Sequence, residues 1–156
     1  MKVTLTINAT KHEIESSPSE TLLAAERFWR SEQFSQWLKE GYLVLADRFY
    51  LSGMVYCGAE GVSFEKFSSI HQGVLKPHLY IYLELPLVIA FQRRRKARDK
   101  WEEADLFREA ARLYPEALDY VRANDAADIC VIDAAKPRID ILQQAFLCIS
   151  QKAHLK

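Results

Sequence analysis

Residues 42–59 read YLVLADRFYLSGMVYCGA, and this stretch decides the fold. It opens with an apolar run over 42–46 and then turns polar at Asp47 and Arg48. A nearly continuous apolar run that ends in polar groups is typical of a parallel strand covered on both faces. We therefore expect a buried strand over 42–46, with Asp47 and Arg48 just beyond its carboxyl end.

Two further apolar runs follow on the C-terminal side, Leu79 to Leu85 and Ile129 to Ile132. Helical periodicity separates and follows them, over 87–98, over 104–124 with a bend expected at Pro115, and over 139–150. Alternation of strand and helix favours an α/β fold with a parallel sheet, in which ligands bind outside the carboxyl ends of the strands. The stretch 58–77 is the longest loop-like segment, with room for a short helix.

On the N-terminal side, residues 2–15 alternate polar and apolar side chains in two short runs, which predicts a β-hairpin. Ser17, Pro18 and Glu20 then form the pattern of a capping box with proline at the first helical position. A long helix is expected from there to about residue 40, closed by Gly41.

The chain has 156 residues, enough for one compact domain, which we divide into the hairpin 1–16 and the remainder 17–156. Lys plus Arg and Asp plus Glu number 21 each, so no net field attracts nucleic acid or an anionic membrane. The longest apolar run, 85–91, is too short to span a bilayer. We expect neither nucleic acid nor a membrane as a partner.

The three cysteines, Cys57, Cys130 and Cys148, are odd in number and widely spaced. No paired-cysteine or Cys/His metal pattern surrounds them. These features fit a reducing compartment, so we expect a cytoplasmic protein.

Asp47 and Arg48 are the first candidates for chemistry. An arginine presents a planar fork to a phosphate, and a carboxylate can hold a metal-bound water or orient that arginine. The alternative is a pair that only caps a strand. Together with the Ser52-containing segment and the aromatic-x-Gly-Ala turn from Tyr56 to Ala59, the stretch resembles the signature of the thymidylate kinase family. The resemblance implies a P-loop kinase-like parallel sheet with flanking helices, here incomplete.

The same resemblance implies roles for individual residues. Asp47 and Arg48 stand at the catalytic positions, with Asp47 near a metal, and Arg48 and Tyr56 at substrate-binding ones. Arg27 falls at the arginine of the family's substrate helix, and Leu23 falls where that helix usually carries an aromatic residue. A leucine can cover a base but offers no ring stacking, which puts thymine selectivity in question. The alternative for Arg27 is a solvated helix face.

Residues 92–102, QRRRKARDKWE, resemble the mobile lid that closes over phosphates in this family. The lid positions fall on Arg94, Arg98 and Lys100, where Lys100 keeps the charge of the usual arginine but not its fork. The alternative is a solvated helix end stabilised by the helix dipole. Just upstream, His78 stands where the family's Pro-Asp-Leu strand has its aspartate, and it is more typical of a loop residue.

Members of the family open with a strand, a G-x-x-x-x-G-K-[ST] loop and a helix, because backbone amides and the lysine hold the donor phosphates. The sequence contains no such loop. The resemblance then implies a gap in the sheet at the position of the family's first strand, which the hairpin or a second copy of the chain could fill. The resemblance implies ATP and Mg²⁺ as cofactors. However, no residue of the sequence is a candidate to hold the donor phosphates, so the chain alone could lack kinase activity and use neither cofactor.

Two functions follow. The first is a thymidylate kinase-like protein that binds a nucleoside monophosphate, dTMP. The second is a non-catalytic, degenerate or chimeric homologue that acts as a structural or protein-interaction module. Either could form a homodimer through the long helix, with Trp29, Phe34 and Trp37 as anchors; the alternative for these aromatics is core packing.

Overall fold

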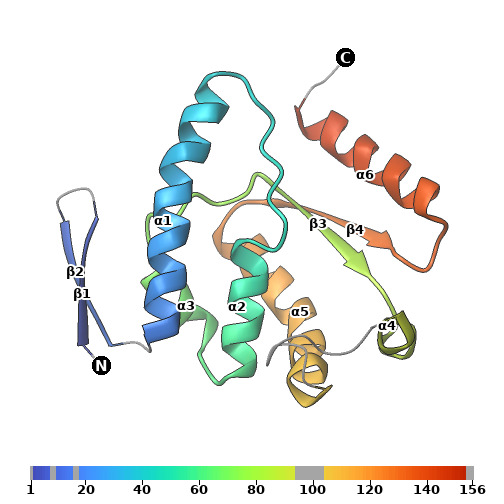
Figure 1. Cartoon of the computed structure of the whole chain (residues 1–156). Coiled ribbons are helices and arrows are strands. Elements are labelled where there is room, and N and C mark those ends of the chain that lie inside the picture. The colour runs from blue at the N-terminus through green and yellow to red at the C-terminus, as the bar shows by residue number, and fades with distance from the viewer. Residues whose placement is uncertain (1, 8–9, 16–17, 94–103, 154–156) are drawn as a thin grey trace. The chain divides into compact units, whose positions relative to one another are not determined.

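The computed structural model describes residues 2–7, 10–15, 18–93 and 104–153 (Figure 1). The chain forms two compact units, Met1–Lys76 and Pro77–Lys156. None of the helices in the described ranges combines the length and the apolar character needed to cross a bilayer.

The first unit begins with the hairpin that the alternating pattern predicts. Strands β1 (Lys2–Ile7) and β2 (Thr10–Glu15) pair antiparallel, with a register that runs from Lys2 opposite Glu15 to Ile7 opposite Thr10. The predicted N-terminal hairpin is therefore confirmed.

Three helices follow in the first unit: α1 (Pro18–Lys39), α2 (Tyr50–Ala59) and α3 (Phe64–Ile70). Helix α1 starts at its predicted proline and ends as predicted, because Gly41 takes a φ of +87° and its N–H donates to the carbonyl of Leu38. Helix α3 is the short helix expected within 58–77, and Ser63 caps it by accepting from the N–H of Lys66.

The predicted strand over 42–46 is wrong. These residues form an irregular link between α1 and α2, and the side chains of Tyr42 and Leu45 are exposed. A strand needs a neighbour for its N–H and C=O groups. In the part of the chain that the structure describes, β1 pairs with β2 and β3 with β4, and 42–46 joins neither sheet. An apolar run indicates a strand only where a partner strand exists.

The core of the first unit lies where α1, α2 and α3 meet. Tyr50 and Phe67 are fully buried and their rings meet edge to face, with centroids 5.2 Å apart. Other buried apolar residues of the first unit are Ala24, Phe28, Met54, Val55, Ile70 and Val74. This core fixes the helix faces that carry the candidate site.

The second unit is α/β with a parallel pair of strands, as predicted. Strands β3 (Leu79–Glu84) and β4 (Asp128–Asp133) run parallel, in a register that places Glu84 opposite Asp133. The helices of this unit are α4 (Leu87–Arg93), α5 (Ala104–Asn124), which continues through Pro115, and α6 (Arg138–Ala153), which contacts both strands (Figure 1).

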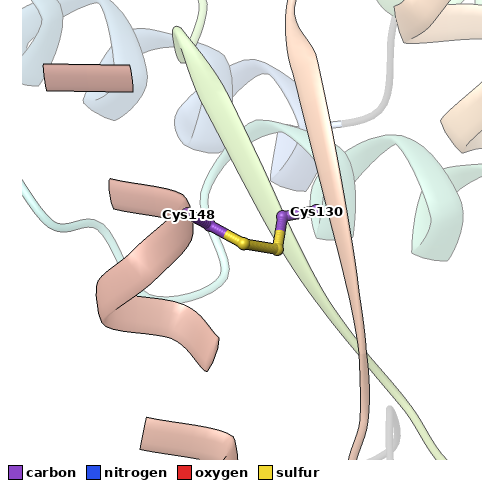
Figure 2. Close-up of a disulfide and its surroundings, with 2 residues drawn as sticks. All are labelled: Cys130 and Cys148. Atoms are coloured by element: carbon purple, nitrogen blue, oxygen red, sulfur yellow. A yellow bond between two sulfur atoms is a disulfide. The ribbon is translucent and has the colours of Figure 1, made fainter. Parts of the chain in front are cut away.

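A disulfide joins Cys130 on β4 to Cys148 on α6, as Figure 2 shows. The spacing of the cysteines along the chain gave no sign of this pairing. The two residues lie 18 positions apart, but the packing of α6 against β4 brings their Cα atoms to 6.5 Å. Cys57 is buried in the first unit and is not part of the disulfide. The cytoplasmic location stays a prediction.

Candidate functional site

The predicted catalytic and substrate-binding residues all belong to the first unit. Leu23 and Arg27 lie on α1, Asp47 and Arg48 on the link before α2, and Tyr56 on α2. The predicted lid residues Arg94, Arg98 and Lys100 lie outside the described residues.

Arg48 occupies an unusual backbone conformation. Its φ is +51°, in the left-handed region that costs a residue with a Cβ about 1–2 kcal/mol. Its side chain is exposed, and the guanidinium carbon lies 4.9 Å from the centroid of the Tyr56 ring. Strain of this kind tends to persist where the side chain has a task. This cation–π contact with Tyr56 favours the guanidinium at that place over the ring.

Asp47 precedes Arg48 in the same bend, and its carboxylate is exposed. The described residues contain no cluster of three or more His, Cys, Asp or Glu side chains suited to a metal ion. A metal held by protein ligands alone therefore has no candidate among them. A single carboxylate does match the usual protein contribution to Mg²⁺, which takes its other ligands from phosphates and water.

Arg27 is buried, with 8% of its surface exposed. Its Nη1 lies 2.9 Å from Nε2 of His71, and its guanidinium lies 5.8 Å from the centroid of the Phe67 ring. Burial removes water from the charge and lowers the pKa of Arg27, an effect that Cys57 and other acidic groups partly offset. Arg27 therefore does not belong to the solvated face of α1.

That solvated face belongs to the neighbours of Arg27. The Nε of Arg30 donates to the Glu26 carboxylate at 2.6 Å, and both side chains are about half exposed. An exposed pair of this kind stabilises a helix by about 0.3–0.5 kcal/mol. The two arginines, one turn apart on α1, thus have opposite surroundings.

Gly53 on α2 makes room for the Arg27 guanidinium. A Cβ at this position would overlap Nη2 of Arg27 and lie 2.8 Å from its Cζ. Glycine inside a helix costs about 0.5–1 kcal/mol relative to alanine, so its presence there signals a close approach. Sequence reasoning missed Gly53 as a site residue; a glycine next to Ser52, inside the stretch that resembles the family signature, was the available signal.

The backbone around Arg27 is tied to the segment after α3. Ser31 Oγ donates to the carbonyl of Arg27 at 2.6 Å and accepts from the N–H of Leu75 at 2.9 Å. Ser31 is itself buried. These bonds join the main chain of α1 at Arg27 to Leu75, in the segment that follows α3 and His71.

Two arginines therefore contact neighbouring positions of one helix. Arg27 lies against Gly53, and Arg48 lies over Tyr56, three residues further along α2. Positions three apart on a helix are neighbours on its surface. Two guanidinium groups against one helix concentrate positive charge there, which favours an anion. Leu23, one turn before Arg27 on α1, is 38% exposed and offers an apolar side chain on the same helix.

Other predicted features have mixed surroundings. Trp29 is 62% exposed, whereas the ring of Phe34 packs between those of Trp37 and Phe49. Homodimerisation through α1 stays a prediction. In the second unit, Glu84 and Asp133 end their strands side by side, and Nη1 of Arg93 donates to the Ala134 carbonyl at 2.9 Å.

Comparison with known proteins gives the family context. The family model described as thymidylate kinase matches residues 3–146. A probable thymidylate kinase 1 of Saccharolobus solfataricus is 29% identical over 130 residues, which cover 83% of this chain and 66% of that relative. A probable thymidylate kinase of Pyrobaculum calidifontis is 31% identical over 116 residues, or 73% and 57% of the two chains.

A bacterial relative gives a similar result. The thymidylate kinase of Francisella tularensis subsp. tularensis is 32% identical over 122 residues, which cover 73% of this chain and 56% of the relative. The chain thus spans between about half and two thirds of the length of the curated relatives it matches.

Proposed function

We propose that this chain, which belongs to the thymidylate kinase family, binds a nucleoside monophosphate, dTMP, at the arginines of its first unit. The observation that carries the proposal is Arg48, which is held at a φ of +51° with its guanidinium stacked on Tyr56. A strained residue that presents an exposed planar cation fits a phosphate ligand.

Arg48 and Arg27 have different parts in the proposal. Arg48 is exposed and binds the phosphate through its guanidinium fork. Arg27 is mostly buried and acts chiefly through its positive charge. Its attraction for the phosphate is stronger in a site that is partly shielded from water. Leu23 covers one face of the base, and the Tyr56 ring keeps Arg48 in its binding orientation.

Mg²⁺ and ATP enter the proposal through the family. Asp47 would hold the Mg²⁺ together with nucleotide phosphates, and the metal would neutralise charge on the phosphates during transfer. We propose phosphoryl transfer from ATP to dTMP as the activity of the complete protein. Because the chain contains no G-x-x-x-x-G-K-[ST] sequence, we expect this chain by itself to bind dTMP without phosphorylating it.

Thermal unfolding with and without dTMP tests the proposal. A ligand that binds only the folded state stabilises that state by about 2.7 kcal/mol when its free concentration is about 100 times its Kd. The midpoint temperature of unfolding must therefore rise. Arg48→Ala should remove the rise, whereas Arg30→Ala, which removes an exposed arginine of α1, should keep it. If Arg48→Ala keeps the full rise, the site lies elsewhere.

The alternative function predicts the opposite. A non-catalytic interaction module gives no rise with dTMP, dUMP or any other monophosphate. That result would remove the nucleotide-binding proposal and leave the interaction module as the account of this chain.

A further inference from the structure

We propose that His71 is a positioning residue that holds the Arg27 guanidinium at the phosphate site of the first unit without neutralising its charge. The inference rests on the proposed function for its ligand, a monophosphate anion. It goes beyond that function by assigning a role, a protonation state and a tautomer to a histidine that lies 44 residues from its partner.

The hydrogen bond between the two side chains can run in only one direction. Nη1 of Arg27 and Nε2 of His71 are 2.9 Å apart. A guanidinium has only donors, so the imidazole must offer a lone pair at Nε2. His71 is therefore not protonated at Nε2, which excludes the imidazolium form.

The other ring nitrogen of His71 contacts a backbone carbonyl. Nδ1 of His71 lies 2.9 Å from the backbone carbonyl oxygen of Phe67, which can only accept. Nδ1 must therefore carry the proton and donate. The two contacts together select one species, the neutral imidazole with its proton on Nδ1.

The His71 ring is buried and confined by its neighbours. His71 is 1% exposed, and its ring stacks on that of Phe67 with centroids 3.9 Å apart and planes at 23°. The Tyr50 ring meets it edge-on, with centroids 5.9 Å apart. Packing on two sides keeps the Nε2 lone pair directed at Arg27.

The guanidinium is thereby fixed from two sides. Nη1 is held by His71, while Nη2 lies in the space that Gly53 leaves by having no Cβ. The main chain of Arg27 is fixed in addition through Ser31. The position of the Arg27 charge is therefore set before any ligand arrives, which reduces the entropy lost on binding.

The identity of the partner explains why this arrangement suits an anion site. Buried cations in proteins are usually paired with carboxylates. A neutral imidazole satisfies one donor of Arg27 but leaves its charge in place. The adjacent carboxylate, Glu26, accepts a hydrogen bond from Arg30, and it acts on Arg27 only through its charge, which raises the pKa of Arg27 and partly offsets the effect of burial. A phosphate is then the ligand that completes the charge balance at Arg27.

Nuclear magnetic resonance of the imidazole nitrogens in the isotope-labelled chain tests the tautomer directly. The chain has four histidines, and His71→Gln identifies the resonance by its loss. We expect a protonated Nδ1 and an unprotonated Nε2 at neutral pH. A protonated Nε2, as the other tautomer or as imidazolium, would overturn the proposal.

Two substitutions separate positioning from mere packing. His71→Gln can still accept from Arg27 through Oε1, whereas His71→Leu fills a similar volume without an acceptor. We expect His71→Leu to weaken dTMP binding about tenfold, and His71→Gln to stay within about threefold of the unchanged chain. Equal weakening by both, or no weakening by either, would contradict the positioning role. His78→Gln, at an exposed histidine, is the matched control and should have no effect.

The two proposals fail separately. If the unchanged chain binds no monophosphate, the proposed function fails, and the nitrogen resonances still decide whether His71 holds Arg27. If the chain binds dTMP but His71 is protonated at Nε2, the positioning inference alone fails. Should His71→Leu not fold, the tautomer measured in the unchanged chain and the affinity of His71→Gln still test the inference.

Discussion

Gly53 and Arg27 occupy one space: a Cβ on residue 53 would lie 2.8 Å from Cζ of Arg27 and 3.2 Å from Cζ of Phe67. Helix α2 therefore has a glycine at the position where the buried Arg27 side chain of α1 packs against it. This relationship links a local sequence choice, which weakens the helix, to the placement of a charge. It also suggests how to test whether that charge is held where the structure has it.

Gly53→Ala should destabilise the fold by about 1–3 kcal/mol, because the added methyl group displaces the guanidinium from a packed site. The effect outweighs the gain of about 0.5–1 kcal/mol that alanine brings to a helix. Denaturant unfolding measures the change. In an Arg27→Ala background the same substitution should cost much less, since the main clash is gone. Purely additive effects of the two substitutions would show that residues 27 and 53 do not share this space.

Arg48→Gly should raise stability while it weakens binding. Glycine adopts a φ of +51° without steric cost, so relief of strain should exceed the entropy penalty and stabilise the fold by up to about 1 kcal/mol. The affinity for dTMP should fall about tenfold or more, because the guanidinium is lost. Arg48→Lys keeps the positive charge but not the planar fork, so its affinity for dTMP should lie between those of the unchanged chain and Arg48→Gly. A less stable Arg48→Gly variant would contradict the backbone strain at residue 48. Unchanged affinity for dTMP would contradict the role of the Arg48 guanidinium in binding.

Reduction of the Cys130–Cys148 disulfide should lower the free energy of unfolding by about 3 kcal/mol, the value typical of a loop of this length. Urea unfolding with and without a reductant measures the difference. Thiol counting gives a second readout: the oxidised chain should expose one thiol on unfolding, that of Cys57, and the reduced chain three. Three thiols in the unreduced, unfolded chain would contradict the pairing.

Tyr82 should make the fold sensitive to alkali. Burial raises the pKa of Tyr82, with smaller contributions from Tyr114 and Glu84. The folded state therefore favours the protonated phenol. This stability is complete below the ordinary tyrosine pKa of about 10 and is lost as the pH rises through the higher folded value. Tyr82→Phe should lose less stability between about pH 8 and about pH 11 than the unchanged chain. Tyr42→Phe, at an exposed tyrosine, is the control; equal losses in both variants would contradict the assignment.

Local signals predicted several elements correctly. The hairpin over 2–15 followed from alternation, the end of α1 from Gly41, and the strands β3 and β4 from apolar runs between helices. Each of these depends on neighbours close in sequence or on a pairing that exists within the second unit. The strand expected over 42–46 failed because a strand also requires a partner, which no apolar run specifies by itself.

The candidate site was predictable in part for a similar reason. Arg48 and Tyr56 lie in one short stretch, and the motif brought them together before their stacking was known. The burial of Arg27 depends on His71, far along the chain, and on the absence of a side chain at residue 53. The pairing of Cys130 with Cys148 likewise depends on how α6 packs. Contacts between distant segments are the part that composition and periodicity do not encode.

The central claim is that the two arginines of the first unit bind a nucleoside monophosphate. Titration of the chain with dTMP in a calorimeter, repeated with Arg48→Ala and Arg30→Ala, tests it most directly. The account predicts saturable binding by the unchanged chain and by Arg30→Ala, and a loss of at least about tenfold in affinity for Arg48→Ala. Absence of binding to the unchanged chain, or equal binding by all three proteins, would contradict it.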